Sequence, residues 1–306
     1  MDSAFAPDLW ILVTLAAAVF QTGRFMLQKH LATDTLSAGG ATFSRFLYSA
    51  PFVALLLPLY LALSGQGVPP LEAGFWLYGA MGGTAQIMAT VCVVLLFKQR
   101  NFAVGITFKK TEVIQTVLMA WIVLGEGVSG AGFAAIALGV LGLLLLSGGA
   151  EARGLRLSDL RNRAAGLGIA SGFLFAISAV CYRGASLAVA SGDPLLRAGV
   201  TLAAVVLMQT LIMALWLRLR EPGQIRRVWA ARRVAVWIGL TSMGGSLCWF
   251  IAFTLQNAAY VKALGQVELM LSIAATTLFF RERISRREWA GMAVLAVSIL
   301  MLVLVT

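Results

Sequence analysis

Long apolar runs dominate the chain, and each is about as long as one membrane crossing. A helix needs roughly 20 apolar residues to span the hydrocarbon core of a bilayer. The 306 residues are 60% hydrophobic and only 12% charged, with a mean hydropathy of +0.88. In soluble domains, about a quarter of the residues are charged. We therefore expect an all-α integral membrane protein with about ten transmembrane helices.

The expected crossings are separated by short connections. We place them at about 9–30, 36–63, 72–97, 102–124, 128–148, 164–189, 194–218, 234–256, 259–280 and 287–305. The second run is long, which favours a helix that is either tilted or broken at Pro51 or Pro58. A transmembrane β-barrel is excluded, because its strands are segments of about ten residues with alternating polarity.

The formal charge of +11 lies mostly in alternate connections. The basic residues after the first, third, fifth, seventh and ninth runs are Lys29, Lys98, Arg100, Arg153, Arg156, Arg161, Arg163, Arg218, Arg220, Arg226, Arg227, Arg232, Arg233, Arg281, Arg283, Arg286 and Arg287. By the positive-inside rule these connections are cytoplasmic, and both termini lie outside. The charge is thus a topology signal, and it predicts no nucleic-acid partner.

The two halves of the chain share a weak repeat. The segment LGEGVSGAGFAA at 124–135 aligns with FRERISRREWAG at 280–291 at an offset of 156 residues, and the same offset aligns Glu112 with Glu268. Five crossings in each half would make the second half enter the membrane from the opposite side, as in transporters with inverted repeats. We expect an inverted 5+5 repeat with units at 1–150 and 151–306.

Several segments resemble the drug/metabolite transporter superfamily, and its EamA-like family in particular. They are TEVIQTVLMAWIVLGEGVSGAGF, VELMLSIAATTLFFRERISRREW and SRFLYSA at 44–50. The proline that usually follows the glutamate is replaced by Val113 and Leu269. The resemblance implies a helical carrier whose fifth and tenth helices lie outside a central cavity. It also implies termini inside the cell, whereas the charge bias places them outside.

Lys109, Lys110 and Glu112 lie within an apolar run, where ionisable groups usually face a cavity or a partner. Lys109 and Glu112 are three residues apart and share a helix face. One interpretation is an internal ion pair that only neutralises itself. The other is a cationic pocket for an anionic substrate, and the resemblance to nucleotide-sugar carriers, whose lysines meet phosphates, favours it slightly.

Other polar residues of the runs give further candidates. Glu268 is a better candidate for proton coupling than Glu112. The alternative role for Glu268 is that of a hydrogen-bonded structural acid. Lys262 is expected to lie nearer the membrane surface. Gln21, Arg24 and Gln28 form one stripe on the first helix, which either lines the cavity or bonds another helix.

The remaining candidates lie on the second and eighth runs. Trp249 and Tyr48 either stack on a substrate or pack in the core. Arg45 is interpreted as an anchor whose head group reaches the cytoplasmic surface, and a role in the cavity is the less favoured alternative.

The sequence lacks the marks of a catalytic or cofactor site. It has one histidine, no phosphate-binding glycine-rich loop and no metal-ligand spacing among Cys92, Cys181 and Cys248. We therefore expect no enzyme activity, cofactor or metal. We expect a secondary transporter of a small polar or amphipathic metabolite, either an amino-acid or metabolite exporter or a carrier of anionic metabolites, with protons as a candidate coupling ion. The alternative is a flippase of an anionic lipid head group. Placement in a bacterial inner membrane, as a monomer or a homodimer, is expected.

Overall fold

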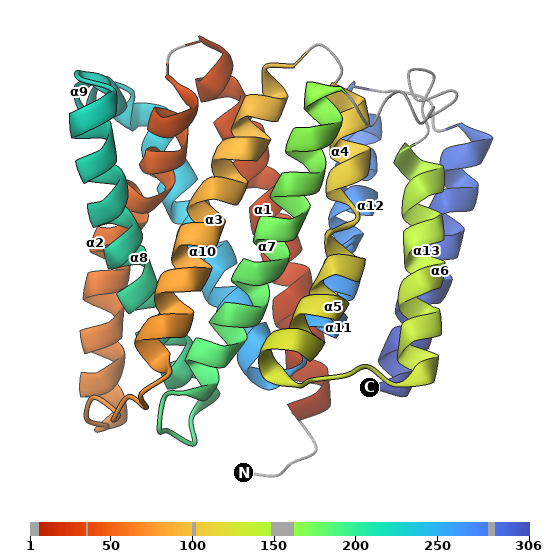
Figure 1. Cartoon of the computed structure of the whole chain (residues 1–306), viewed down its shortest axis with the longest axis horizontal. Helices are drawn as coiled ribbons and strands as arrows, with labels where there is room; N and C mark the ends of the chain where they lie inside the picture. Colours follow the sequence, from red (N-terminus) through yellow and green to blue (C-terminus); the bar gives the residue numbers. More distant parts are fainter. Residues whose placement is uncertain (1–5, 35, 100–101, 148–161, 281–284) are drawn as a thin grey trace.

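The chain is a bundle of roughly parallel and antiparallel helices (Figure 1). The computed structural model describes residues 6–34, 36–99, 102–147, 162–280 and 285–306. Within them the helices are α1 (Ala6–Asp34), α2 (Ala38–Ser64), α3 (Phe75–Phe97), α4 (Phe102–Lys109), α5 (Glu112–Leu124), α6 (Gly130–Ser147), α7 (Arg163–Leu187), α8 (Pro194–Arg220), α9 (Gln224–Ala230), α10 (Arg232–Leu255), α11 (Ala258–Leu264), α12 (Val267–Phe280) and α13 (Arg286–Val305).

The described helices fit a membrane protein, as the apolar runs predicted. Seven of them, α1, α2, α3, α7, α8, α10 and α13, are long and apolar enough to cross a bilayer. The all-α membrane class is therefore confirmed, while the expected ten-helix inverted repeat stays a prediction. Of the two alternatives for the second run, the break is wrong, because α2 continues through both Pro51 and Pro58, and the tilt stays a prediction.

Several helix starts are fixed by side chains that accept hydrogen bonds from free backbone N–H groups. Ser37 caps α2, Asn162 caps α7, Asp193 caps α8 and Asn257 caps α11. Ser285 begins α13 with a reciprocal capping box, in which Glu288 also bonds the Ser285 backbone. These caps mark where the chain leaves a polar connection and enters an apolar run.

The expected fourth and ninth crossings are each divided into two helices, α4–α5 and α11–α12. At both breaks the backbone hydrogen bonds change from the pattern of an α-helix, between residues four apart, to that of a 3₁₀ turn, between residues three apart. The amide of Lys110 donates to the Thr107 carbonyl at 3.1 Å, and that of Gln266 donates to the Ala263 carbonyl at 3.2 Å. Both breaks form without the family's proline, so tertiary packing sets them.

A close approach of α7 supports the first break. A Cβ atom on Gly172 of α7 would lie 2.9 Å from the Lys109 carbonyl oxygen and 3.3 Å from the Glu112 amide nitrogen. Only a glycine lets the backbone of α7 lie this close to the turn between α4 and α5.

The packing partners of the helices come from both halves of the chain. α3 packs along α7, and α1 packs along α10. α6 and α13 pack against each other at one edge of the bundle (Figure 1). Their outward faces carry exposed leucines, such as Leu141 and Leu300, as a lipid-facing helix requires.

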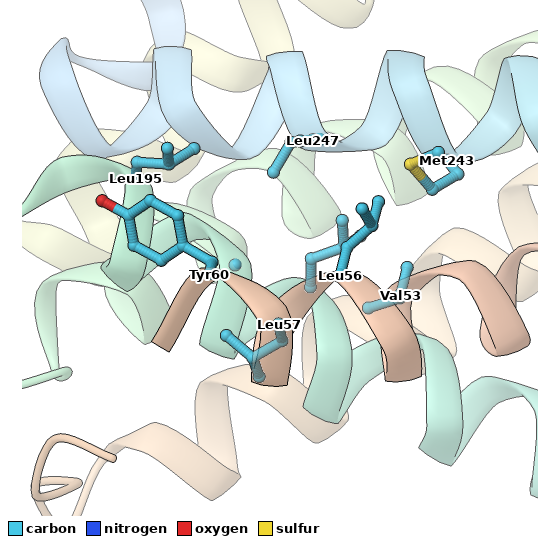
Figure 2. A pocket seen from close by; sticks show the side chains of 9 residues that line it. Val53, Leu56, Leu57, Tyr60, Leu195, Met243 and Leu247 are labelled. Atoms are coloured by element: carbon cyan, nitrogen blue, oxygen red, sulfur yellow. The ribbon is translucent and has the colours of Figure 1, made fainter. Parts of the chain in front are cut away.

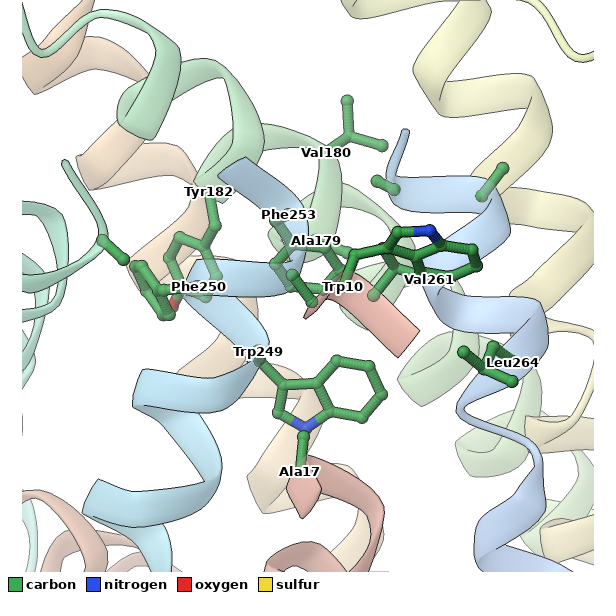
Figure 3. Close-up of a cluster of buried hydrophobic side chains, with 14 of the residues drawn as sticks. Trp10, Ala17, Ala179, Val180, Tyr182, Trp249, Phe250, Phe253, Val261 and Leu264 are labelled. Atoms are coloured by element: carbon green, nitrogen blue, oxygen red, sulfur yellow. The ribbon is translucent and has the colours of Figure 1, made fainter. Parts of the chain in front are cut away.

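The main core cluster lies where α1, α7, α10 and α11 meet (Figure 3). Trp249, Phe250 and Tyr182 belong to this cluster, and the Tyr182 and Phe250 rings lie 4.4 Å apart between centroids. Trp10 also belongs to it, with 3% exposure.

The basic connection that contains α9 lies at one end of the bundle, and α1 begins and α13 ends at the opposite end (Figure 1). Exposed arginines surround α9, among them Arg226, Arg232 and Arg233. The described parts of the two termini therefore share one face of the bundle, away from this basic connection.

Candidate functional site

The two helix breaks each place an acidic residue in the first turn of the next helix. Glu112 is the first residue of α5 and is 4% exposed, and Glu268 is the second residue of α12. A carboxylate in the first turn of a helix interacts favourably with the helix dipole. The breaks thus hold both carboxylates inside the bundle at the start of a helix.

Glu112 is the centre of a buried ion cluster. Its Oε2 lies 3.3 Å from Lys109 Nζ, and its Oε1 lies 2.6 Å from Lys262 Nζ on α11. The internal ion pair proposed from the sequence spacing is therefore present, but it has a second cation. The side chain of Lys262 is 11% exposed, and its expected position nearer the membrane surface stays a prediction.

Aromatic rings cover the two lysines of this cluster. Lys262 Nζ lies 4.9 Å from the Trp249 ring centroid, and Lys109 Nζ lies 5.2 Å from that of Phe175. Ring faces attract ammonium groups, most strongly where water is excluded. The cluster is thus held by Glu112 on one side and by aromatic faces on the other.

Glu268 is bonded to a neutral amide. Gln21 Nε2 donates to Glu268 Oε2 at 2.6 Å, and Trp249 Nε1 donates to Gln21 Oε1 at 3.2 Å. These two bonds join α10, α1 and α12. Gln21 satisfies both alternatives of the sequence interpretation, because it bonds other helices and also lines a cavity.

Arg24 and Arg45 are two further cations inside the bundle, with exposures of 3% and 5%. Arg24 donates to Gln28 Oε1 at 2.8 Å, and Gln28 donates to the Ala41 carbonyl at 3.2 Å, which ties α1 to α2. Arg45 donates to Thr90 Oγ1 at 3.3 Å and to Ser246 Oγ at 3.2 Å. The expected surface anchor at Arg45 is therefore wrong.

A small cavity of about 20 Å³, hereafter the central cavity, brings these groups together. Its polar lining includes Gln21, Arg24, Arg45, Gln86 and Lys262, and its apolar lining is mostly aromatic. A neighbouring cavity of about 290 Å³ is lined by Lys109, Lys110 and Glu268, among others. Its volume is close to the lower end of the range of small-molecule pockets, which is about 300–1,000 Å³.

The comparisons with known proteins identify the family. Residues 162–304 match the model of the EamA-like transporter family. The matched part of the chain, residues 162–304, therefore belongs to this family. A search of curated proteins found no match. Among the 27 matching chains of solved structures, one crystal structure of a protein covers 100% of both chains with a TM-score of 0.73 and 16% identity, which shows a shared fold.

The apolar helices and the family match indicate a multi-pass membrane protein, and the family suggests a transporter of the drug/metabolite type. The cavities described above lie among helices from both halves of its chain. The family assignment does not identify the solute, so the lining residues must indicate what the transporter accepts.

The structure brings together all but one of the residues singled out in the sequence. Lys109, Lys110, Glu112, Glu268, Gln21, Arg24 and Trp249 line the two cavities or bond residues that do. Tyr48 does not join them. Its hydroxyl donates to the Val228 carbonyl at 3.2 Å, and its ring stacks on Trp229 with centroids 6.4 Å apart.

Sequence reasoning missed Arg45 and Lys262 as cavity residues. The signal that singled out Lys109, a charge within an apolar run, applied to Arg45 too. Both residues lie near the expected ends of their runs, so a surface position fitted them equally well. Gln86, Ser246 and Tyr182 also line the central cavity, and no charge marks them in the sequence.

The described charges of the site do not balance. The buried or half-buried cations are Arg24, Arg45, Lys109, Lys110 and Lys262, and the anions are Glu112 and Glu268. Glu112 neutralises part of this charge through its two lysines. Arg24 and Arg45 lie within 4 Å of no carboxylate in the described ranges.

Proposed function

We propose that this chain is a secondary transporter for a small organic anion, which binds in the central cavity. One observation carries the proposal. Arg24, Arg45 and Lys262 line this cavity, and none of the described residues that line it is acidic. Removing a cation from water costs several kcal/mol unless an anion compensates it. A carboxylate or phosphate on the solute would supply that compensation.

The rest of the lining favours an anion with an apolar or aromatic part. Phe175, Tyr182, Trp249, Phe250 and Phe253 lie in the same wall as the cations. Aromatic side chains bury large apolar areas and also accept cations over their faces. An amphipathic metabolite, such as an aromatic or branched carboxylic acid, would use both kinds of surface.

Alternating access between two inverted units, residues 1–150 and 151–306, would move the solute. The packing of the helices supports this. The contact of α3 with α7 has a counterpart in that of α1 with α10, as a two-fold axis between the units would require. The breaks at α4–α5 and α11–α12 are a second such pair.

Glu268 is the better candidate for coupling transport to protons. It lies in a cavity with Lys110 and accepts a hydrogen bond from a neutral amide, whereas Glu112 is held by two lysines. The distribution of basic residues supports an orientation with the α9 end in the cytoplasm and both termini outside, in a bacterial inner membrane. Either a monomer or a homodimer fits this arrangement.

One observation favours the alternative, a flippase of anionic lipid head groups. An apolar groove opens between α2, α8 and α10 (Figure 2), and a lipid head group would need such a lateral opening. The small-anion transporter is the better supported function, because the cations lie in the central cavity and the groove itself has an apolar lining.

Arg45→Gln in purified protein tests the proposal. The binding probes are a panel of monocarboxylates, dicarboxylates and phosphate esters, scored by the rise in melting temperature and then by uptake into proteoliposomes. We expect wild-type protein to be stabilised by some of these anions. Arg45→Gln should lose at least about tenfold in affinity, the equivalent of one charge-assisted hydrogen bond.

The ligand-free stability of Arg45→Gln separates a binding role from a structural one. Removing a buried cation without a carboxylate partner should leave the melting temperature of the free protein unchanged or higher. Arg233→Gln, a change of an exposed arginine near α9, is the matched control and should bind as wild type does. Stabilisation by cations or neutral solutes alone, or full anion affinity in Arg45→Gln, would contradict the proposal.

A further inference from the structure

The connection from α8 to α10 carries a dense cluster of exposed positive charge. It comprises the last residues of α8, the short helix α9 and the first residues of α10, at one end of the bundle (Figure 1). Residues 218–233, hereafter the basic surface, contain a single acid, Glu221. Their arginines are all exposed, and they are Arg218, Arg220, Arg226, Arg227, Arg232 and Arg233.

The described part of the protein does not neutralise this charge. Arg232 donates a long hydrogen bond, at 3.4 Å, to the Trp229 carbonyl. The other arginine side chains of the basic surface donate to none of the described residues, and none of its arginines lies within 4 Å of a described carboxylate. Glu221 instead accepts a hydrogen bond from Ser37 Oγ, at the start of α2. The guanidinium groups are therefore open to an external anion.

The helix α9 is fixed on the bundle by one face and exposes an apolar face beside it. Val228 packs in a buried cluster with Tyr48 of α2, and the Tyr48 hydroxyl donates to the Val228 carbonyl at 3.2 Å. Ile225 and Trp229 are four residues apart, so they share a second face, and they are 37% and 61% exposed. Tyr48 thus holds in place a helix that presents both arginines and apolar side chains.

The basic surface lies where the head groups of a bilayer would meet the protein. The two helices that it joins, α8 and α10, are both long and apolar enough to cross a membrane. Leu219 and Trp237, near its two ends, are 68% and 59% exposed. Tryptophan is enriched at membrane–water interfaces, and basic residues next to a membrane helix attract anionic lipids.

We propose that the basic surface binds the head groups of anionic phospholipids in the membrane that the protein spans. Its arginines donate to the lipid phosphates, because the guanidinium fork matches phosphate oxygens. Ile225 and Trp229 lie at the boundary between head groups and acyl chains. This inference is independent of the proposed solute transport, since it concerns a surface outside both cavities.

A lipid surface fits the basic surface better than a soluble anion does. A free phosphate or an acidic protein segment would pair with the arginines but would leave Ile225 and Trp229 in water. A short helix with basic residues beside exposed apolar ones is typical of segments that lie in the membrane interface. Both kinds of side chain on α9 are then used by one partner.

Arg226→Gln combined with Arg227→Gln tests the proposal in the purified full-length protein. The probes are phosphatidylglycerol and phosphatidylcholine with the same acyl chains, titrated into detergent-solubilised protein and scored by the rise in melting temperature. Wild-type protein should bind phosphatidylglycerol at least about tenfold more tightly than phosphatidylcholine. This preference should shrink at high salt, because salt screens exposed charges.

The double variant should lose about tenfold in affinity for phosphatidylglycerol and should bind phosphatidylcholine as wild type does. Arg163→Gln combined with Arg286→Gln is the matched control. These two arginines are also exposed, in the first turns of α7 and α13, and their replacement removes the same charge. The control should lose less than about threefold. All three proteins should melt at the same temperature without lipid, because the changed side chains are exposed.

Three outcomes would overturn the inference. The first is equal affinity of wild-type protein for the two lipids. The second is an equal loss in the two double variants, which would reduce the effect to overall charge. The third is binding of inorganic phosphate or of an oligoglutamate peptide as tightly as phosphatidylglycerol, which would assign the basic surface to a soluble anion. The proposed transport is tested separately by Arg45→Gln, so either idea can fail without the other.

Discussion

The two helix breaks hold their carboxylates in similar backbone positions but in different surroundings. Glu112 begins α5 and forms ion pairs with two lysines, one from its own half of the chain and one from α11. Glu268 lies in the first turn of α12 and accepts a hydrogen bond from the neutral side chain of Gln21. The backbone arrangement is repeated, whereas the electrostatics are not.

This difference supports a structural role for Glu112 and leaves a transport role to Glu268 as the hypothesis. A carboxylate fixed by two ammonium groups holds its charge and joins the two breaks, because Lys262 of α11 reaches Glu112 of α5. Glu268 is bonded by the Gln21 amide and lines a cavity with Lys110. Glu112 therefore joins the two breaks, and the coupling role of Glu268 stays a prediction.

The largest expected effect comes from neutralising the two acids in turn. Glu112→Gln leaves Lys109 and Lys262 without their buried counter-charge, and it should destabilise the protein by about 3–5 kcal/mol. Glu268→Gln keeps an oxygen that can accept from Gln21, so about 1 kcal/mol is expected. Unfolding of the detergent-solubilised variants by denaturant, followed by tryptophan fluorescence, measures both.

A double variant is the control for this pair. Glu112→Gln combined with Lys262→Met removes one cation together with the acid, and it should recover part of the lost stability. Equal losses in Glu112→Gln and Glu268→Gln would show that the surroundings of the two acids do not differ in energy, and the assignment of separate tasks would fail.

A smaller effect is expected where α7 packs on the first break. Gly172→Ala would place a Cβ 2.9 Å from the Lys109 carbonyl oxygen and should cost about 1–3 kcal/mol, as overpacking does. Gly23→Ala on α1 is the matched control, because its Cβ meets no atom within 4 Å and alanine favours helix. The same unfolding assay applies, and a neutral Gly172→Ala would mean that the close approach does not hold the break.

Much of this arrangement follows from the sequence, and the exceptions share one physical cause. Apolar run length predicted the helical membrane class, and the three-residue spacing gave the Lys109–Glu112 pair as one of two interpretations, because both depend on neighbours along the chain. The bond from Lys262 to Glu112 joins residues 150 positions apart. No local pattern shows which of several buried acids a distant lysine will reach.

The remaining wrong predictions concern how deeply a residue lies in the bundle and which way its side chain points from the helix. Arg45 was placed at the surface because the depth of a residue depends on how its helix is placed in the bundle, which apolar length leaves open. Tyr48 lies only three residues further along α2, yet its hydroxyl bonds the Val228 carbonyl. A separation of three residues left the two side chains with different neighbours, and only tertiary packing decides which of them faces a cavity.

The smallest expected effect concerns Asp193, an acid that, like Glu268, is bonded by neutral donors but lies in a connection at the start of α8. Burial raises the pKa of Asp193, but hydrogen bonds from Tyr60, Gln66 and the backbone N–H groups of Leu195 and Leu196 lower it further, to below its ordinary value of 3.8. Because the folded state binds this proton less readily than the unfolded state does, the stabilisation is present above about pH 4 and is lost as the pH falls through the folded pKa.

Asp193→Asn keeps a helix cap but removes this titration, since asparagine caps helices about as well as aspartate. The difference in melting temperature between wild type and Asp193→Asn should be smaller than the effect of Gly172→Ala at pH 6 and should shrink as the pH falls below 4. Tyr60→Phe removes one donor and should show part of the same loss. A difference that does not change with pH would mean that neutral donors do not favour the charged form of Asp193.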